Sequence, residues 1–180
     1  SIALALRGVP AIYLHSLVGT RNHVALALET GVKRDVNRAP LDLEILERNL
    51  ADPQSKLHLL AAAYRPLLRA RVASRAFHPR GAQRVLRLSP AVFSLVRTSP
   101  AGDERVVCLT NVTGGEQEID VSTRELGVRE EPWYDLLGGR GWLASGGRLT
   151  VRLGPYELVW LTPAAELERR VGASEASGVS

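Results

Sequence analysis

The chain has 180 residues, of which 45% are hydrophobic, enough for one or two packed cores. Charged residues make up 23%, which is unlike the composition of a disordered protein. The length excludes a complete barrel of eight βα units, which needs roughly 200–250 residues. Because no apolar run reaches the ~20 residues that span a bilayer, we expect no membrane segment.

The numbers of cysteine and methionine residues bear on the cellular compartment of the protein and on whether the chain is a whole protein. The single cysteine, Cys108, excludes an intrachain disulfide, which fits a reducing compartment, and we therefore expect a cytoplasmic protein. Its apolar neighbours, Val107 and Leu109, predict a small core residue rather than a reactive thiol. No methionine is present, even at position 1, so the chain is expected to be part of a longer protein.

Positive charge is concentrated in the first half of the chain. Of the 23 basic residues, all but Lys33 and Lys56 are arginine, and the formal net charge is +4. Residues 1–80 hold 12 basic and 6 acidic residues, a balance of +6, and residues 81–180 hold 11 and 13, a balance of −2. The arginines are spread out, without the interleaved aromatic residues that stack bases, so nucleic acid is not an expected partner. The alternative that these arginines form a basic pocket for phosphate or carboxylate is left open.

The first 40 residues combine short apolar runs with a long polar loop. Residues 2–6 are typical of the end of a buried helix, and residues 8–10 break it. The apolar run at residues 11–14 then predicts a strand buried on both faces, as in a parallel sheet. Residues 15–40 are polar, with one helical turn expected at residues 24–29, and loops that follow parallel strands often carry function.

Helical spacing of apolar residues resumes after this loop. Asp42 is placed to cap a first helix. Asp52 followed by Pro53 predicts the start of a second helix. That helix is expected to be kinked or interrupted at Pro66.

Beyond about residue 76 the hydrophobic period changes from 3.6 to 2, and turn signals separate short runs of β-forming residues. Seven strands are predicted, at residues 84–88, 92–97, 105–111, 116–121, 133–136, 148–153 and 157–161. Strands of this length and spacing predict an antiparallel sandwich. The glycine-rich run at residues 138–141 is interpreted as a hairpin turn, and residues 164–180 as a disordered tail.

The residues best suited to bind a ligand lie at positions 33–38, with the sequence Lys-Arg-Asp-Val-Asn-Arg. Arginine presents a rigid fork of donors to carboxylates, phosphates and sugar hydroxyls. An extended chain here would project Arg34 and Val36 to one side and Asp35 and Asn37 to the other. Two interpretations stay open: the segment binds a polar ligand, or it ties itself together by pairing of Asp35 with an arginine.

Few other residues suggest a definite chemistry. His15 and His23 lie near this segment, but their spacing fits no metal site, and a catalytic role requires that Asp35 and Ser16 meet them. No phosphate-binding glycine loop or dinucleotide motif is present, so no cofactor and no metal are expected. Several aromatic residues could form a carbohydrate-stacking patch, although core packing is favoured: Trp133, Tyr134, Trp142, Tyr156 and Trp160.

Three stretches of the chain, taken in order, carry a resemblance to a known family. They are Gly8-Val9-Pro10-Ala11-Ile12-Tyr13, Leu17-Val18-Gly19-Thr20-Arg21-Asn22 and Lys33-Arg34-Asp35-Val36-Asn37-Arg38. The first is similar to the last barrel strand of α-amylase-clan enzymes. The other two are similar to loops of the sucrose phosphorylase subfamily, which includes glucosylglycerate phosphorylases. With a helix and a sandwich following, the likeness covers nearly the whole chain.

The resemblance implies an α+β fold, in which the last strand and helix of a (β/α)8 barrel precede an antiparallel β-sandwich. Residues 1–75 would be the C-terminal end of the catalytic barrel, with an acceptor loop, and residues 76–163 the all-β domain. The parent protein would transfer a glucosyl unit between an α-glucoside, of the sucrose or glucosylglycerate type, and phosphate with retention of configuration. Its nucleophile and acid/base would belong to earlier strands, so the isolated chain is expected to be inactive.

What the resemblance carries over to this chain is the acceptor side of the reaction. The family places an arginine at the entrance that receives phosphate or the leaving sugar, and Arg34 occupies that position. Asp35, Asn37 and Arg38 would shape the same loop, and with Asn22 they complete the expected substrate-binding residues. The expected partners are a carbohydrate and inorganic phosphate, with neither nucleic acid nor a membrane, and whether the parent forms a homodimer is left open.

One residue departs from the family pattern. The family usually has aspartate after the loop asparagine, and this chain has His23. If that aspartate orders the loop by pairing with an arginine, a neutral His23 cannot do so. Two alternatives to the phosphorylase stay open. One is a hydrolase or transglucosylase of the same clan, and the other is a non-catalytic carbohydrate-binding β-module, which an exposed row of Trp133, Trp142 or Tyr156 would favour.

Overall fold

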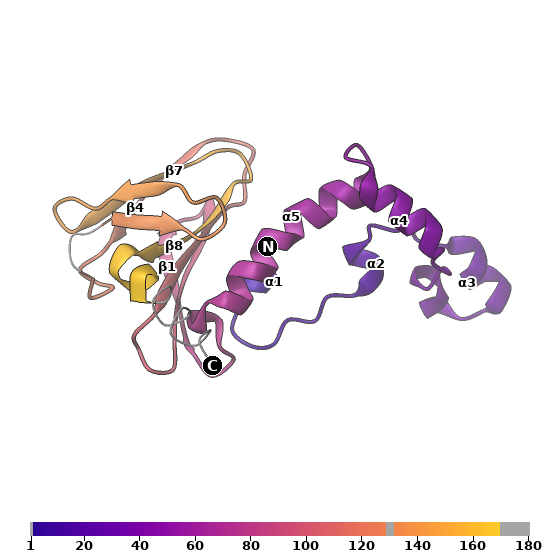
Figure 1. The fold of residues 1–180 in the computed structure, drawn as a ribbon, viewed down its shortest axis with the longest axis horizontal. Helices are drawn as coiled ribbons and strands as arrows, with labels where there is room; N and C mark the ends of the chain where they lie inside the picture. The colour runs from indigo at the N-terminus through magenta and orange to yellow at the C-terminus, as the bar shows by residue number, and fades with distance from the viewer. Residues whose placement is uncertain (1, 129–131, 170–180) are drawn as a thin grey trace, which may run out of the picture. The chain divides into compact units, whose positions relative to one another are not determined.

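The computed structural model describes residues 2–128 and 132–169, and the chain divides into two compact units. The first, called the β unit below, comprises Ser1–Val9 and Arg69–Ser180, and the second, the helical unit, comprises Pro10–Leu68. In Figure 1 the colour follows the residue number through both units. Within the described residues, none of the helices has the length and hydropathy needed to span a bilayer.

The β unit is a sandwich of two antiparallel sheets (Figure 1). One sheet has six strands in the order β1-β2-β3-β8-β5-β6, and the other pairs β4 with β7. The strands are β1 (Ala82–Ser89), β2 (Val92–Thr98), β3 (Arg105–Asn111), β4 (Gln117–Ser122), β5 (Pro132–Asp135), β6 (Gly141–Leu143), β7 (Arg148–Leu153) and β8 (Leu158–Pro163).

Alternation of side chains decides which residues enter the core between the sheets. In β7, Leu149, Val151 and Leu153 are buried while the residues between them are exposed. From the larger sheet, Val107 and Leu161 are cross-strand partners on β3 and β8 and join the same cluster. The predicted α+β fold with an antiparallel sandwich is confirmed, and each of the seven predicted strands has an observed counterpart.

Two short helical elements, α1 (Ile2–Ala5) and the 3-10 helix η2 (Arg75–Phe77), pack on the opposite face of the larger sheet. The ring of Phe77 lies against that of Trp160, with centroids 4.5 Å apart. Cys108 is the cross-strand partner of Trp160, so its side chain points to the same side, where it is 2% exposed. The predicted core position of Cys108 is therefore confirmed.

Burial raises the pKa of the Cys108 thiol far above its ordinary value, because the thiolate would lose its hydration, and the nearby Arg97 and Arg71 offset only part of this. We expect the folded chain to resist iodoacetamide at mildly alkaline pH, and the chain in guanidinium to be labelled within minutes. Mass spectrometry of the two samples measures the difference. Labelling of the folded chain at the rate of the denatured one would contradict the assignment.

Two buried arginines, Arg71 and Arg97, hold the N-terminal residues within the β unit. Arg97 is 0% exposed and Arg71 is 8% exposed. Their acceptors are backbone carbonyl oxygens: those of Ala5, Ala82 and His78 for Arg97, and those of Leu4, Leu6 and Gly8 for Arg71. Burial lowers the pKa of both guanidiniums, and the repulsion between them lowers that of Arg97 further. The carbonyl oxygens at the end of α1 thus accept hydrogen bonds from Arg97, on β2, and from Arg71, near the end of the helix that precedes the sandwich.

The helical unit has little core of its own. It consists of α2 (Leu14–Leu17), α3 (Val24–Thr30), the 3-10 helix η1 (Lys33–Asn37), α4 (Leu43–Ala51) and the first part of α5 (Lys56–Ala73). Among its described residues, Leu57 and Leu67 are the ones less than a tenth exposed. Large apolar side chains more than half exposed in this unit are Leu14, Val24, Leu28, Leu43 and Leu59.

Side-chain caps begin both long helices of this unit. The carboxylate of Asp42 accepts a hydrogen bond from the N–H of Ile45 at 3.0 Å, which confirms its predicted role at the start of α4. The next helix, α5, begins later than predicted. Its first turn is capped by Ser55, whose hydroxyl accepts from the N–H of His58 at 3.0 Å.

One prediction for this half of the chain is wrong and another is narrowed. Residues 11–13 have no regular secondary structure and α2 begins at Leu14, where the sequence predicts a buried strand. A parallel strand depends on hydrogen bonds to neighbouring strands, and the described part of the helical unit contains no strand to supply them. Helix α5 continues through Pro66, so the interruption that the sequence allows there does not occur, and a kink at Pro66 stays a prediction. The assignment of residues 1–75 to the end of a barrel stays a prediction.

Two features of the β unit differ from the predictions. The hairpin turn after β5 is present, but its second strand, β6, has three residues and was not predicted. Residues 164–169 are helical rather than disordered. The carboxylate of Glu166, which is 6% exposed, accepts from the N–H of Arg105 at 2.6 Å and pairs with its guanidinium at 3.0 Å. The rest of the predicted tail, residues 170–180, lies outside the described residues.

Candidate functional site

The predicted ligand-binding segment folds as the 3-10 helix η1 and not as extended chain. With three residues per turn, Arg34 and Asn37 share a face, so the predicted grouping of Arg34 with Val36 is wrong. η1 follows Gly31, whose φ of +68° ends α3 in the left-handed conformation that glycine adopts without strain. This turn brings η1 back against α3.

Two hydrogen bonds tie η1 to earlier parts of the helical unit. The hydroxyl of Tyr13 donates to the carbonyl oxygen of Asn37 at 2.7 Å. The backbone N–H of His23 donates to the carbonyl oxygen of Val36 at 2.6 Å. The ring of Tyr13 in turn stacks on that of His15, with centroids 5.2 Å apart and planes 29° from parallel. The segment therefore has a defined geometry although its side chains are mostly exposed.

Asp35 is held by a threonine and not by an arginine. The hydroxyl of Thr30 donates to the Asp35 carboxylate at 2.8 Å. The ion pairs found among the described residues include neither Arg34 nor Arg38. The interpretation in which the segment ties itself together through an Asp–Arg pair is therefore wrong. Both guanidiniums, on exposed side chains, are open to an anion from solution.

The two histidines near η1 have structural partners. The Nδ1 of His15 lies 2.9 Å from the hydroxyl of Thr20. The Nδ1 of His23 accepts from the N–H of Leu26 at 2.9 Å and thereby caps α3. Since the carboxylate of Asp35 is bonded to a threonine, the described residues do not assemble the His–Asp pair that proton transfer would need.

His23 thus orders the start of α3 by capping it, a role that needs no arginine. Aspartate, the residue usual in the family, is itself a preferred N-cap. We expect His23→Asp to preserve α3 and His23→Ala to destabilise it by about 1 kcal/mol. Hydrogen exchange of the Leu26 amide measures this, with faster exchange in the alanine variant only. Equal exchange in all three proteins would contradict the capping role.

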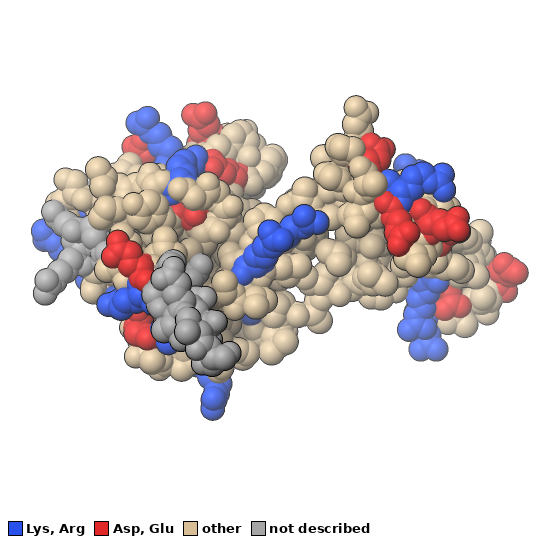
Figure 2. Space-filling view, in the orientation of Figure 1, with Lys and Arg blue, Asp and Glu red and all other residues tan. Residues whose placement is uncertain are grey.

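The five predicted substrate-binding residues lie on or beside η1. Asn22, Arg34, Asn37 and Arg38 are exposed and Asp35 is half-buried. Figure 2 shows basic and acidic side chains interspersed over the part of the chain that carries α3 and α4. Against this mixed background, residues 33–38 hold three cations and one acid, and the acid is bonded to a hydroxyl. The segment can therefore attract phosphate or a carboxylate.

Two residues of this arrangement were not anticipated from the sequence. Tyr13 and Thr30 each donate a hydroxyl hydrogen bond that fixes η1. Tyr13 belongs to the run predicted as a strand, and it lies 24 residues before its partner. No local spacing could reveal such a contact.

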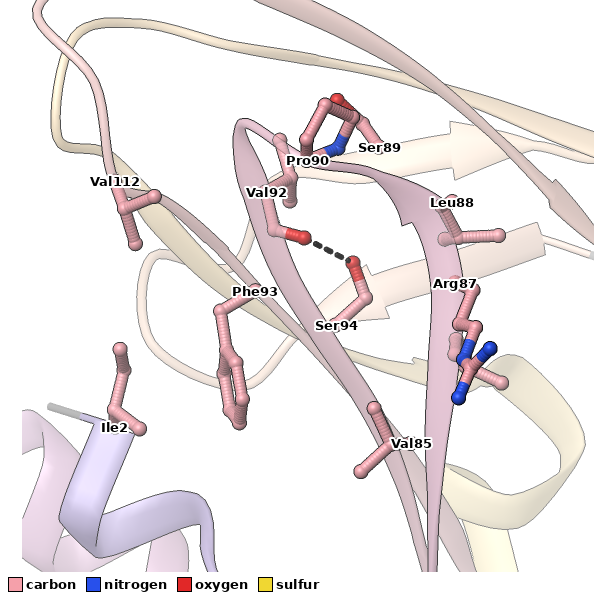
Figure 3. A pocket seen from close by; sticks show the side chains of 11 residues that line it. Ile2, Val85, Arg87, Leu88, Ser89, Pro90, Val92, Phe93, Ser94 and Val112 are labelled. Atoms are coloured by element: carbon pink, nitrogen blue, oxygen red, sulfur yellow. Dashed lines mark hydrogen bonds between the residues drawn. The ribbon is translucent and has the colours of Figure 1, made fainter.

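The cavities of the β unit are lined by other residues. One, of about 550 Å³, runs along β1 and β2 and is mostly apolar, with Val85, Phe93 and Val112 in its lining (Figure 3). A second, of about 380 Å³, includes Arg84 and Arg105. Within the described ranges, no three metal-ligating side chains come together.

Comparison with curated proteins gives relatives of one kind. The chain is 37% identical over 168 residues to a glucosylglycerate phosphorylase of Spirochaeta thermophila, covering 91% of this chain and 29% of that protein. It is 35% identical over 160 residues to a glucosylglycerate phosphorylase of Allomeiothermus silvanus, covering 89% and 25%. The chain therefore spans between a quarter and a third of the length of the curated relatives it matches. No protein-family model matches it.

Solved structures show the same fold at lower identity. The crystal structure of AmyP in complex with maltose superposes with a TM-score of 0.71 at 20% identity, over 91% of this chain and 34% of that one. The α-amylase from H. orenii superposes with a TM-score of 0.62 at 17% identity, over 90% and 34%. The resemblance drawn from the sequence is thereby confirmed: the chain is similar to one section of glucosylglycerate phosphorylases, and it shares its fold with structures of α-amylases.

Proposed function

We propose that this chain forms the acceptor side of a glycoside phosphorylase, which transfers a glucosyl unit between an α-glucoside of the glucosylglycerate type and phosphate with retention of configuration. The observation that carries the proposal is the 37% identity to a glucosylglycerate phosphorylase over 91% of the chain. Since the match covers 29% of that relative, we assign the activity to a longer protein. The chain alone is expected to be inactive.

Retention requires two displacements at the anomeric carbon. A carboxylate first displaces the leaving group with help from an acid, and an acceptor then releases the glucosyl unit. We assign these carboxylates to the remainder of the longer protein. Of the two acids in the first forty residues, Glu29 is exposed on α3 and Asp35 is bonded to Thr30. The part left to this chain is the choice of acceptor, phosphate rather than water.

The residues on η1 are suited to that choice. Arg34 would bind phosphate through two N–H donors of its fork, and Arg38 would add a second positive charge. Asn37, on the same face as Arg34, would offer amide donors to phosphate or to the leaving acid. Asp35 would position the segment through Thr30, and Asn22, next to the cap of α3, would border the entrance. Because the positive charges of Arg34 and Arg38 attract phosphate but not uncharged water, such a site favours phosphorolysis over hydrolysis.

The product formed by the longer protein tests the proposal. With glucosylglycerate and phosphate supplied together, we expect α-glucose 1-phosphate to accumulate, which ³¹P NMR detects directly. The isolated chain of 180 residues should release none. Release of free glucose at a rate independent of phosphate would identify a hydrolase instead.

The alternative of a non-catalytic carbohydrate-binding module has lost its main support. Trp133 and Trp160 are 0% and 1% exposed and belong to the packed interior. Trp142 is half-buried, with the guanidinium of Arg140 stacked 4.5 Å above its ring. A binding module of this kind would need an exposed row of Trp133, Trp142 and Tyr156. Of these three side chains, all in the described part of the chain, Tyr156 alone is well exposed, so no such row is present.

A further inference from the structure

Tyr156 has an unusual backbone conformation for its residue type. Its φ is +55°, and among the described residues it is the one position other than glycine with a positive φ. The N–H of Glu157 donates to the carbonyl oxygen of Gly154 at 3.1 Å, which makes Tyr156 the third residue of a turn. Glycine or asparagine usually fills that position, since a bulky side chain is strained there. Strain of this kind points to a role other than folding.

The turn is held rigidly against a neighbouring loop. The side-chain amide of Asn111, which is 1% exposed, donates to the carbonyl oxygens of Gly115 and Gly154, both at 2.7 Å. The N–H of Tyr156 donates to the carbonyl oxygen of Thr113 at 3.0 Å. These bonds leave the tyrosine little backbone freedom to lose when it binds a ligand.

The ring of Tyr156 lies beside Gly114 at its hydroxyl end, and most of the residue is open to solvent. A methyl group added at Gly114 would lie 3.5 Å from the tyrosine hydroxyl and 3.8 Å from two ring carbons, so the hydroxyl end of the ring lies close to this glycine. The residue is nevertheless 70% exposed. The carboxylate of its neighbour Glu157 forms an ion pair with Arg140 at 2.8 Å, so two charged groups lie next to the turn.

We propose that Tyr156 is a stacking platform for a pyranose ring, in a carbohydrate-binding site of the β unit. A pyranose has an apolar C–H face of about the area of one aromatic ring, and its hydroxyls can reach charged groups at the edge. A protein partner would need a wider apolar surface, whereas the residues beside Tyr156 are glycines, a proline and a glutamate. The site requires no catalysis, so it stands apart from the proposed phosphorylase activity.

Titration of the purified chain with maltoheptaose, followed by calorimetry, tests the site. We expect Tyr156→Gly to weaken binding at least about tenfold because the stacking surface is lost. The same variant should melt about 2–4 °C higher because the strained φ is relieved. Tyr156→Phe should bind within about threefold of the unmodified chain, since the ring is kept. Tyr134→Ser, at a tyrosine 37% exposed on β5, is the matched control and should bind normally.

Two results would overturn the site. One is the absence of maltoheptaose binding by the unmodified chain, and the other is equal binding by the chain and by Tyr156→Gly. A higher melting temperature of Tyr156→Gly with unchanged binding would leave the tyrosine as a strained surface residue only. Because these measurements need no phosphorylase activity, their failure is distinct from failure of the proposed function.

Discussion

Arg97→Met is expected to destabilise the β unit by about 3–5 kcal/mol. The guanidinium is 0% exposed and donates to three backbone carbonyl oxygens, those of Ala5, Ala82 and His78. Methionine keeps much of the volume but leaves these acceptors without donors in a place that water does not reach. Since one acceptor belongs to α1, amide exchange of residues 2–6 should also become faster.

Urea unfolding followed by near-ultraviolet circular dichroism measures the effect, because Trp160 lies in the affected packing against Phe77. Arg87→Met is the matched control, at an exposed arginine of β1, and should change the unfolding free energy by less than about 0.5 kcal/mol. The loss of unfolding free energy in Arg97→Lys should lie between those of Arg97→Met and Arg87→Met, since one ammonium group cannot donate to three separated acceptors. A loss below about 1 kcal/mol for Arg97→Met would show that these hydrogen bonds contribute little.

Arg34→Ala, made in the longer protein, is expected to reduce kcat/KM for phosphate about tenfold to a hundredfold. A charge-assisted hydrogen bond to phosphate is the interaction removed, and the free energy of such bonds sets this range. Hydrolysis should change less than about twofold, because water makes no demand on the guanidinium. The ratio of phosphorolysis to hydrolysis therefore falls.

The matched control is Arg48→Ala, at an exposed arginine on α4 of the same unit, which should leave both rates unchanged. Arg34→Lys should restore part of the phosphate dependence, since it keeps the charge but not the fork. Equal losses of phosphorolysis and hydrolysis in Arg34→Ala would exclude a specific role in binding phosphate.

The sandwich could be predicted because burial on one face leaves a period of two in the sequence. The predicted bounds of β3 (Arg105–Asn111) and β7 (Arg148–Leu153) agree with the observed ones. Residues 11–14 and 33–38 were predicted less well. An apolar run predicts a strand only if partners supply hydrogen bonds, and a run of six residues with five polar side chains has no apolar period to distinguish a 3-10 helix from extended chain.

Residues 33–38 were selected from their residue types and Asn22 from the resemblance, but the contacts of the candidate site could not be predicted from either. Spacing cannot show that Tyr13 reaches the carbonyl oxygen of Asn37 or that Thr30 reaches Asp35. The buried role of Arg71 was also hidden, since arginines are rarely buried and composition alone favours solvated faces for them. Its acceptors are carbonyl oxygens near the start of the chain, 63 to 67 residues away, and no sequence pattern marks them.

Hydrogen exchange of the longer protein, with and without phosphate, tests most directly whether this chain receives the acceptor. The peptide that contains η1 (Lys33–Asn37) can be followed by mass spectrometry, with a peptide from α4 (Leu43–Ala51) as internal reference. We predict slower exchange in the η1 peptide when phosphate binds, and no change in the reference. Unchanged exchange in the η1 peptide at a phosphate concentration that saturates the enzyme would contradict the account.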